Sequence, residues 1–114
     1  MALRIVPYDE FVALIHEIAT EDPAFVYNND SRLGCYYHKN PKITKHDKRC
    51  IIGEALFRLG MEEPELRTIT QGANQELRRL GFDANTCRWA RAVQIKQDEG
   101  ASWSEAVQVT VEEE

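Results

Sequence analysis

The sequence predicts an α+β fold: a compact, mostly helical domain of four or five helices with one antiparallel β-hairpin near residues 24–38. Two observations predict it. Apolar residues recur at helical spacing through most of the chain, and each such stretch is bounded by capping residues, glycine or proline. One early stretch instead holds two short runs of β-branched and aromatic residues, 24–27 and 33–38, around the turn-favouring residues 28–31. The 114 residues suffice for a single globular domain, 1–114, with a solvated acidic tail at 112–114.

The first helix is predicted over residues 7–20. Asp9 and Glu10 in its first turn complement the helix dipole, and Pro23 marks its end. The apolar residues on one face are Tyr8, Phe11, Val12, Ile15, Ile18 and Ala19. His16 falls on the polar side, where we expect a surface histidine.

A second helix is predicted over residues 48–59, with Asp47 as its N-cap and Gly60 in a left-handed conformation after its end. Its apolar stripe consists of Ile51, Ile52, Ala55, Leu56 and Leu59. Gly53 lies inside this helix, where glycine costs about 1 kcal/mol relative to alanine. We therefore expect a neighbouring backbone to approach closely at Gly53.

The next two helices are predicted from their ends. Residues 64–66 open a short turn, and a third helix then ends at Gly81 and Phe82, a pair typical of a Schellman motif. Asp83 can cap a fourth helix that continues to about residue 99, with Gly100 closing it.

A last short helix is predicted from Ser102 and Glu105, which match a capping box. The residues around Val107 also alternate as in a strand, and this alternative over 107–111 stays open beside the helix. Trp103 on this helix and Trp89 on the preceding one are expected in the core.

Composition indicates a soluble, cytoplasmic protein. No apolar run reaches membrane-spanning length, and the first residues lack the apolar region of a signal peptide. Three cysteines, Cys35, Cys50 and Cys87, form an odd set at no disulfide-framework spacing. We expect them as buried thiols in a reducing compartment.

The most informative feature is a cluster of charge. Between Ser31 and Arg49 the chain carries six basic residues and one acid, a local charge of +5 in a protein whose net charge is −5. Such segregation is typical of a surface that meets a partner. The predicted partner-binding residues are Arg32, Tyr36, Tyr37, Lys39, Lys42, Lys45, Lys48 and Arg49.

We expect a non-enzymatic binding or regulatory protein in which the lysines steer an acidic protein partner and Tyr36 and Tyr37 anchor it. A second copy of the chain could take the partner's place as a homodimer, because the rest of the protein is acidic. The alternative function is nucleic-acid binding by the same segment, since basic residues beside aromatics can neutralise phosphates and stack bases.

No motif of a catalytic centre is present, so we predict no enzyme activity and no cofactor. Four potential zinc ligands, Cys35, His38, His46 and Cys50, lie in the basic segment, but their spacing matches no common zinc finger. We expect folding without metal, with Cys50 packed beside Gly53. The zinc-stabilised form stays open as a variant of the nucleic-acid alternative.

Two segments, 50–60 and 93–107, resemble small uncharacterised proteins of actinobacteria and their phages. Those proteins pair a Cys-aliphatic-aliphatic-Gly-x-Ala-Leu-x-Arg-Leu-Gly helix with a Gln-Asp-x-Gly-x-Ser-Trp ending, and both patterns occur here. The resemblance implies a compact, mostly helical domain with a small hairpin, encoded by a mycobacterial-type host or by a phage that infects one. It carries no catalytic residue.

Overall fold

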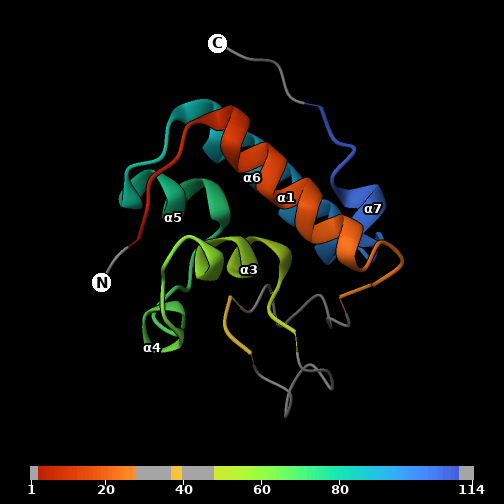
Figure 1. Cartoon of the computed structure of the whole chain (residues 1–114), viewed down its shortest axis with the longest axis horizontal. Helices are drawn as coiled ribbons and strands as arrows, with labels where there is room; N and C mark the ends of the chain where they lie inside the picture. The colour runs from red at the N-terminus through yellow and green to blue at the C-terminus, as the bar shows by residue number, and fades with distance from the viewer. Residues whose placement is uncertain (1–2, 28–36, 40–47, 111–114) are drawn as a thin grey trace.

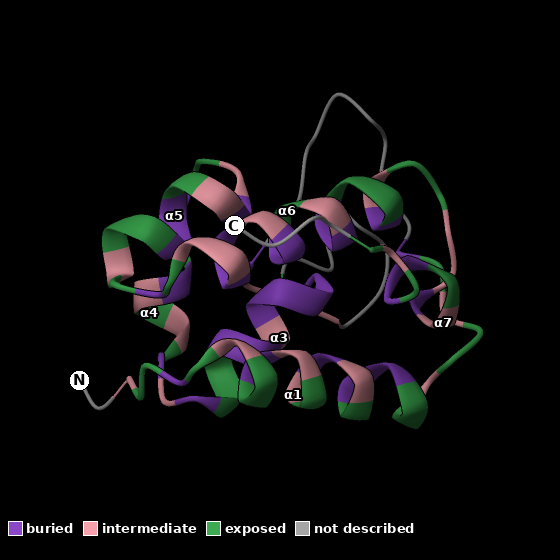
Figure 2. Ribbon diagram, turned by 90° about the horizontal axis from the view of Figure 1, so that it is seen from above, coloured by how far each residue is buried: buried purple, intermediate pink, exposed green. Residues whose placement is uncertain are grey.

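A central helix, flanked by two longer helices, organises the protein. The computed structural model describes residues 3–27, 37–39 and 48–110 (Figure 1). The helices in these residues are α1 (Tyr8–Glu21), α3 (Ile51–Arg58), α4 (Glu63–Leu66), α5 (Ala73–Leu80), α6 (Ala84–Asp98) and α7 (Trp103–Ala106). In Figure 2, α3 lies between α1 and α6. α5 packs along α6, and α7 closes the end formed by α1 and α6.

The apolar stripes form the core as predicted. α1 buries Phe11, Ile15 and Ile18 on the face toward α3 and α6. α3 is buried over most of its surface, because it is covered from both sides. Both tryptophans lie in the core, Trp89 on α6 and Trp103 on α7.

The predicted β-hairpin is wrong. The described residues contain no strand, and the fold they form is helical rather than α+β. Val26 makes an isolated antiparallel bridge with Ser102, and the backbone N–H of Trp103 donates to the carbonyl of Phe25 at 2.8 Å. Tyr27 and Tyr37 are buried in the helical core, and Phe25 packs against Trp103 of α7. The rest of the predicted hairpin, residues 28–36, lies outside the described residues.

Tyr37 shows why the aromatic run at 33–38 was wrongly predicted as a strand. Its side chain is only 2% exposed, and its hydroxyl donates to the carbonyl of Gln71 at 2.9 Å and accepts from Nε2 of Gln94 at 2.7 Å. Burial raises the pKa of Tyr37 to about 12, so the phenol stays neutral. A residue expected to face a partner is therefore a core residue that ties the basic segment to α6.

The close approach predicted at Gly53 is confirmed. A Cβ on Gly53 would lie 2.2 Å from the backbone oxygen of Tyr37 and 2.6 Å from its Cα. Only glycine leaves room for this backbone against α3.

Most predicted helix ends are confirmed. Gly60 and Gly100 have φ of 118° and 102°. Phe82 donates to the carbonyl of Leu77 and Gly81 to that of Arg78, as in a Schellman motif. The two remaining predicted caps are also present, Asp83 as the N-cap of α6 and the Ser102–Glu105 capping box of α7.

Two helix boundaries differ from the prediction. α3 begins at Ile51 rather than at residue 48, because the chain is extended at Cys50, whose Sγ accepts from the N–H of Gly53 at 3.4 Å. Asp47, the predicted cap, lies outside the described residues. α7 ends at Ala106, and residues 107–110 after it form neither helix nor strand.

The cysteines also differ from the expectation of three thiols. Cys50 is disulfide-bonded, whereas Cys87 is free and buried. Burial raises the pKa of the Cys87 thiol. Cys35 lies outside the described residues.

His16 is half-buried rather than a simple surface residue. Its ring stacks on Trp89, with centroids 6.0 Å apart and planes at 26°. As for membranes, none of the helices in the described part of the chain is long and apolar enough to cross one.

Candidate partner-binding pocket

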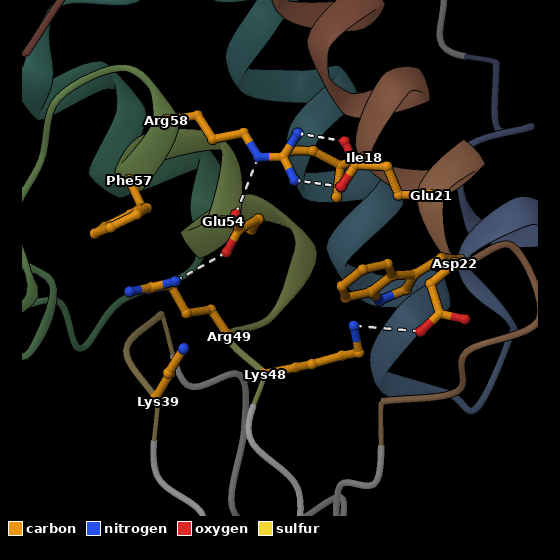
Figure 3. A pocket seen from close by; sticks show the side chains of 10 residues that line it. Ile18, Glu21, Asp22, Lys39, Lys48, Arg49, Glu54, Phe57 and Arg58 are labelled. Carbon is orange, nitrogen blue, oxygen red and sulfur yellow. Dashed lines mark hydrogen bonds and ion pairs between the residues drawn. The ribbon is translucent and has the colours of Figure 1, made fainter.

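A pocket of about 490 Å³ lies where the end of α1 faces α3, α7 and three residues of the basic segment, Lys39, Lys48 and Arg49 (Figure 3). Its described lining residues are Ile18, Glu21, Asp22, Lys39, Lys48, Arg49, Glu54, Phe57, Arg58 and Trp103. Charged side chains of both signs dominate this lining, with aromatic surface at two places. The pocket is therefore suited to a polar, charged partner rather than to an apolar small molecule.

One wall is a chain of ion pairs. Arg58 donates to both carboxylate oxygens of Glu21, at 2.8 and 2.5 Å, and through Nε to Glu54 at 3.0 Å. The other oxygen of Glu54 accepts from Arg49 at 2.9 Å, and Arg49 Nε donates to Glu63 at 2.7 Å. The hydrogen bonds from Arg58 hold the pKa of Glu21 below its ordinary value. This wall links α1, α3 and α4, and its three carboxylates and two guanidinium groups leave one formal negative charge.

Arg49 belongs to this wall and not to an exposed basic surface. Its side chain is 7% exposed, and its guanidinium lies 3.7 Å from the ring centroid of Phe57. Two carboxylates, those of Glu54 and Glu63, neutralise it. Arg49 thus holds the end of the basic segment against α3 and α4.

Lys48 is held differently. Its ammonium lies 3.2 Å from the carboxylate of Asp22, and both side chains are about two-fifths exposed, 39% and 42%. The same ammonium lies 5.1 Å from the ring centroid of Phe25 and 5.5 Å from that of Trp103. The two rings meet edge to face, 4.9 Å apart, so together they form a fixed aromatic corner under the cation.

The basic segment also contacts the helices at residues 37–39, within the segment. The backbone of Tyr37 packs on Gly53, and the backbone N–H of Lys39 donates to Glu63 at 3.2 Å. The side chain of Lys39 is exposed at the pocket rim. Glu63 therefore contacts the basic segment at two places, Lys39 and Arg49, since it also accepts from Arg49.

The structure brings only part of the predicted site together. Lys39, Lys48 and Arg49 all line the pocket, whereas Tyr37 is buried away from any partner and cannot be the anchor we expected. The other four predicted residues, Arg32, Tyr36, Lys42 and Lys45, lie outside the described residues.

The candidate zinc ligands are not assembled in the described residues. Cys50 is disulfide-bonded, and a sulfur in a disulfide offers no thiolate to a metal. His38 is half-buried, and burial lowers its pKa against the opposing effect of Glu63. Cys35 and His46 lie outside the described residues, and no group of potential metal ligands occurs within the described ranges.

Sequence reasoning missed the acidic and aromatic half of the pocket. Phe57 is not part of the apolar stripe predicted for this helix, and its side chain is 41% exposed. Glu54 and Arg58 are spaced i, i+4, a signal that could have been recognised as an ion pair. Asp22 carries no such signal, because its contact with Lys48 depends on the fold.

Comparison of the chain with protein-family models, with curated proteins and with solved structures finds no match.

Proposed function

We propose that the protein is a non-enzymatic binding protein that docks an acidic segment of a partner protein at this pocket. The observation that carries the proposal is the placement of Lys39, Lys48 and Arg49, three basic residues of the +5 segment, along one pocket. The backbone at Tyr37 packs on α3, and Glu63 holds both Lys39 and Arg49. The ammonium groups of Lys39 and Lys48 can there attract a carboxylate-rich chain.

The residues that line the pocket would contribute to partner binding in three ways. Lys39 and Lys48 place ammonium groups at the rim, where they can meet carboxylates. Phe57 offers an exposed ring for an apolar side chain of the partner, in place of the anchor that Tyr37 cannot provide. Arg49 shapes the wall and keeps Phe57 in position. If the chain is phage-encoded, as the two family-like segments suggest, the partner would be a host protein.

The direct test is the binding of a labelled acidic peptide, in which glutamate alternates with alanine around one central phenylalanine, followed by fluorescence anisotropy. The triple variant K39E/K42E/K45E should lose at least about tenfold in affinity, because each reversal replaces attraction by repulsion. The control is the single reversal K96E, at an exposed lysine of α6 away from the pocket lining. Equal affinity of the triple variant and the control would overturn the assignment of the site.

The rival partners give different results in the same series. A labelled single-stranded oligonucleotide that binds more tightly than the peptide, with affinity falling steeply with salt, would favour nucleic acid. Light scattering at low and high salt tests the homodimer, since a dimer built on the basic segment should dissociate as salt rises.

A further inference from the structure

We propose that the Nζ of Lys48 is the point at which the partner's carboxylate binds, and that Asp22 occupies this point in the unbound protein. This inference rests on the proposed function and makes it more specific. It assigns a carboxylate-binding position to the pocket, at which the carboxylate of Asp22 competes with that of the partner.

The contacts of Lys48 are of two kinds: two aromatic rings that stay in place, and a carboxylate that another carboxylate can replace. The rings of Phe25 and Trp103 hold the ammonium from one side. Trp103 itself is fixed, because its indole N–H donates to the buried side chain of Gln97 at 3.0 Å. The aromatic corner thus sets the position of the ammonium group. A carboxylate of the partner can bind there without any movement of the two rings.

The carboxylate of Asp22 is the exchangeable member. Its pair with Lys48 has both side chains about two-fifths exposed, and ion pairs in such settings contribute little to stability. Arg49 offers the opposite case, since its carboxylate partners are part of the wall and its own side chain is buried. Of these two adjacent basic residues, Lys48 is therefore the one that can change partner without disturbing the helices.

Replacement of Asp22 by asparagine should then tighten binding of the acidic peptide described above. The variant D22N removes the competing charge while the shape of the side chain is kept. We expect up to about a fivefold gain in affinity, the equivalent of an exposed ion pair. The matched control is D9N, which changes the net charge equally at an exposed position of α1 outside the pocket lining.

The variant K48M completes the test. It removes the ammonium group and should therefore weaken peptide binding. In the double variant K48M/D22N the gain in affinity caused by D22N should be lost. Thermal melting of each variant checks that the fold is retained. D22N tighter than D9N, with the gain lost in K48M/D22N, supports the inference. Equal affinities of D22N and D9N, or a gain that persists in K48M/D22N, overturn it while the proposed function stands. No binding of the peptide to the wild-type protein overturns the proposed function instead.

Discussion

The side-chain carbonyl of Gln97 accepts a hydrogen bond from the backbone N–H of Ile51, at 2.8 Å, in the buried interior. Ile51 is the first residue of α3, so a side chain of α6 satisfies an N–H that the helix itself cannot. The same oxygen accepts from Trp103. One turn earlier, Gln94 satisfies the first N–H of α5, that of Ala73, at 2.9 Å. α6 thus fixes the starts of two other helices and, through Trp103, the aromatic corner of the pocket.

The variant Gln97→Leu should lower the free energy of unfolding by about 2–5 kcal/mol, because two buried N–H donors lose their acceptor at about 1–3 kcal/mol each. Urea denaturation followed by tryptophan fluorescence measures it. Gln75→Leu, at an exposed position of α5, is the control. A loss no larger than that of the control would mean that Gln97 does not organise the core.

Gly53→Ala should destabilise the protein by about 1–3 kcal/mol, although alanine is the better helix former by about 1 kcal/mol. The added methyl group would collide with the backbone of Tyr37, which cannot rotate away as a side chain can. Gly72→Ala is the matched comparison, since there the nearest atoms belong to the flexible side chain of Arg91. A Gly53→Ala variant as stable as the wild type would contradict the close packing of the basic segment on α3.

These positions also show how far the sequence could predict the molecule. Gly60, Gly100 and the Ser102–Glu105 box were predictable because each depends on neighbours within one helical turn. Tyr37 was not, because its place is set by α3, α6 and the carbonyl of Gln71, all distant along the chain. Short runs of β-branched and aromatic residues cannot distinguish a strand from a non-helical residue such as Tyr37 that is buried among helices.

The candidate site, too, could be predicted from the sequence only in part. Local charge density identified Lys48 and Arg49 as neighbours in a basic segment. It could not reveal that Arg49 is neutralised by Glu63, or that Lys48 meets Asp22, since both contacts join residues far apart in sequence. Charge counting therefore overestimated how much of the charge of Lys48 and Arg49 faces solvent.

The disulfide predicts a definite thiol count. Of the three cysteines, Cys50 is bonded and Cys87 is free, so the denatured, unreduced protein should titrate one thiol per chain, and three after reduction. In the native state Cys87 should react slowly, because it is buried and its thiol pKa is raised. Three thiols before reduction would contradict the bond, and two thiols with a covalent dimer on a non-reducing gel would indicate a bond between chains.

Asp98→Asn should stabilise the protein at neutral pH, by up to about 1 kcal/mol. Burial raises the pKa of the Asp98 carboxyl, and this residue ends α6, where the dipole disfavours a negative charge. A raised carboxyl pKa favours the folded state below the ordinary value near 3.8, and this contribution is lost as pH rises through the folded-state pKa. The advantage of the variant should therefore shrink as the pH is lowered.

Thermal melting between pH 3 and pH 8 follows this difference. Glu99→Gln removes an equal charge from the next, exposed position, where the carboxylate lies 3.9 Å from Lys96, and controls for the loss of a negative charge at this helix end. An advantage of Asp98→Asn that equals that of Glu99→Gln at every pH would show that burial of Asp98 has no effect.

The central claim, that an acidic partner docks beside Lys48, is tested most directly by the two indole N–H signals in a ¹⁵N–¹H spectrum during titration with the acidic peptide. Trp103 lines the pocket and lies under Lys48, whereas Trp89 lies away from it and donates to the carbonyl of Val109 at 3.2 Å. The signal of Trp103 should shift progressively while that of Trp89 stays in place. Saturable peptide binding that leaves Trp103 unmoved, or that shifts Trp89 instead, would contradict this account.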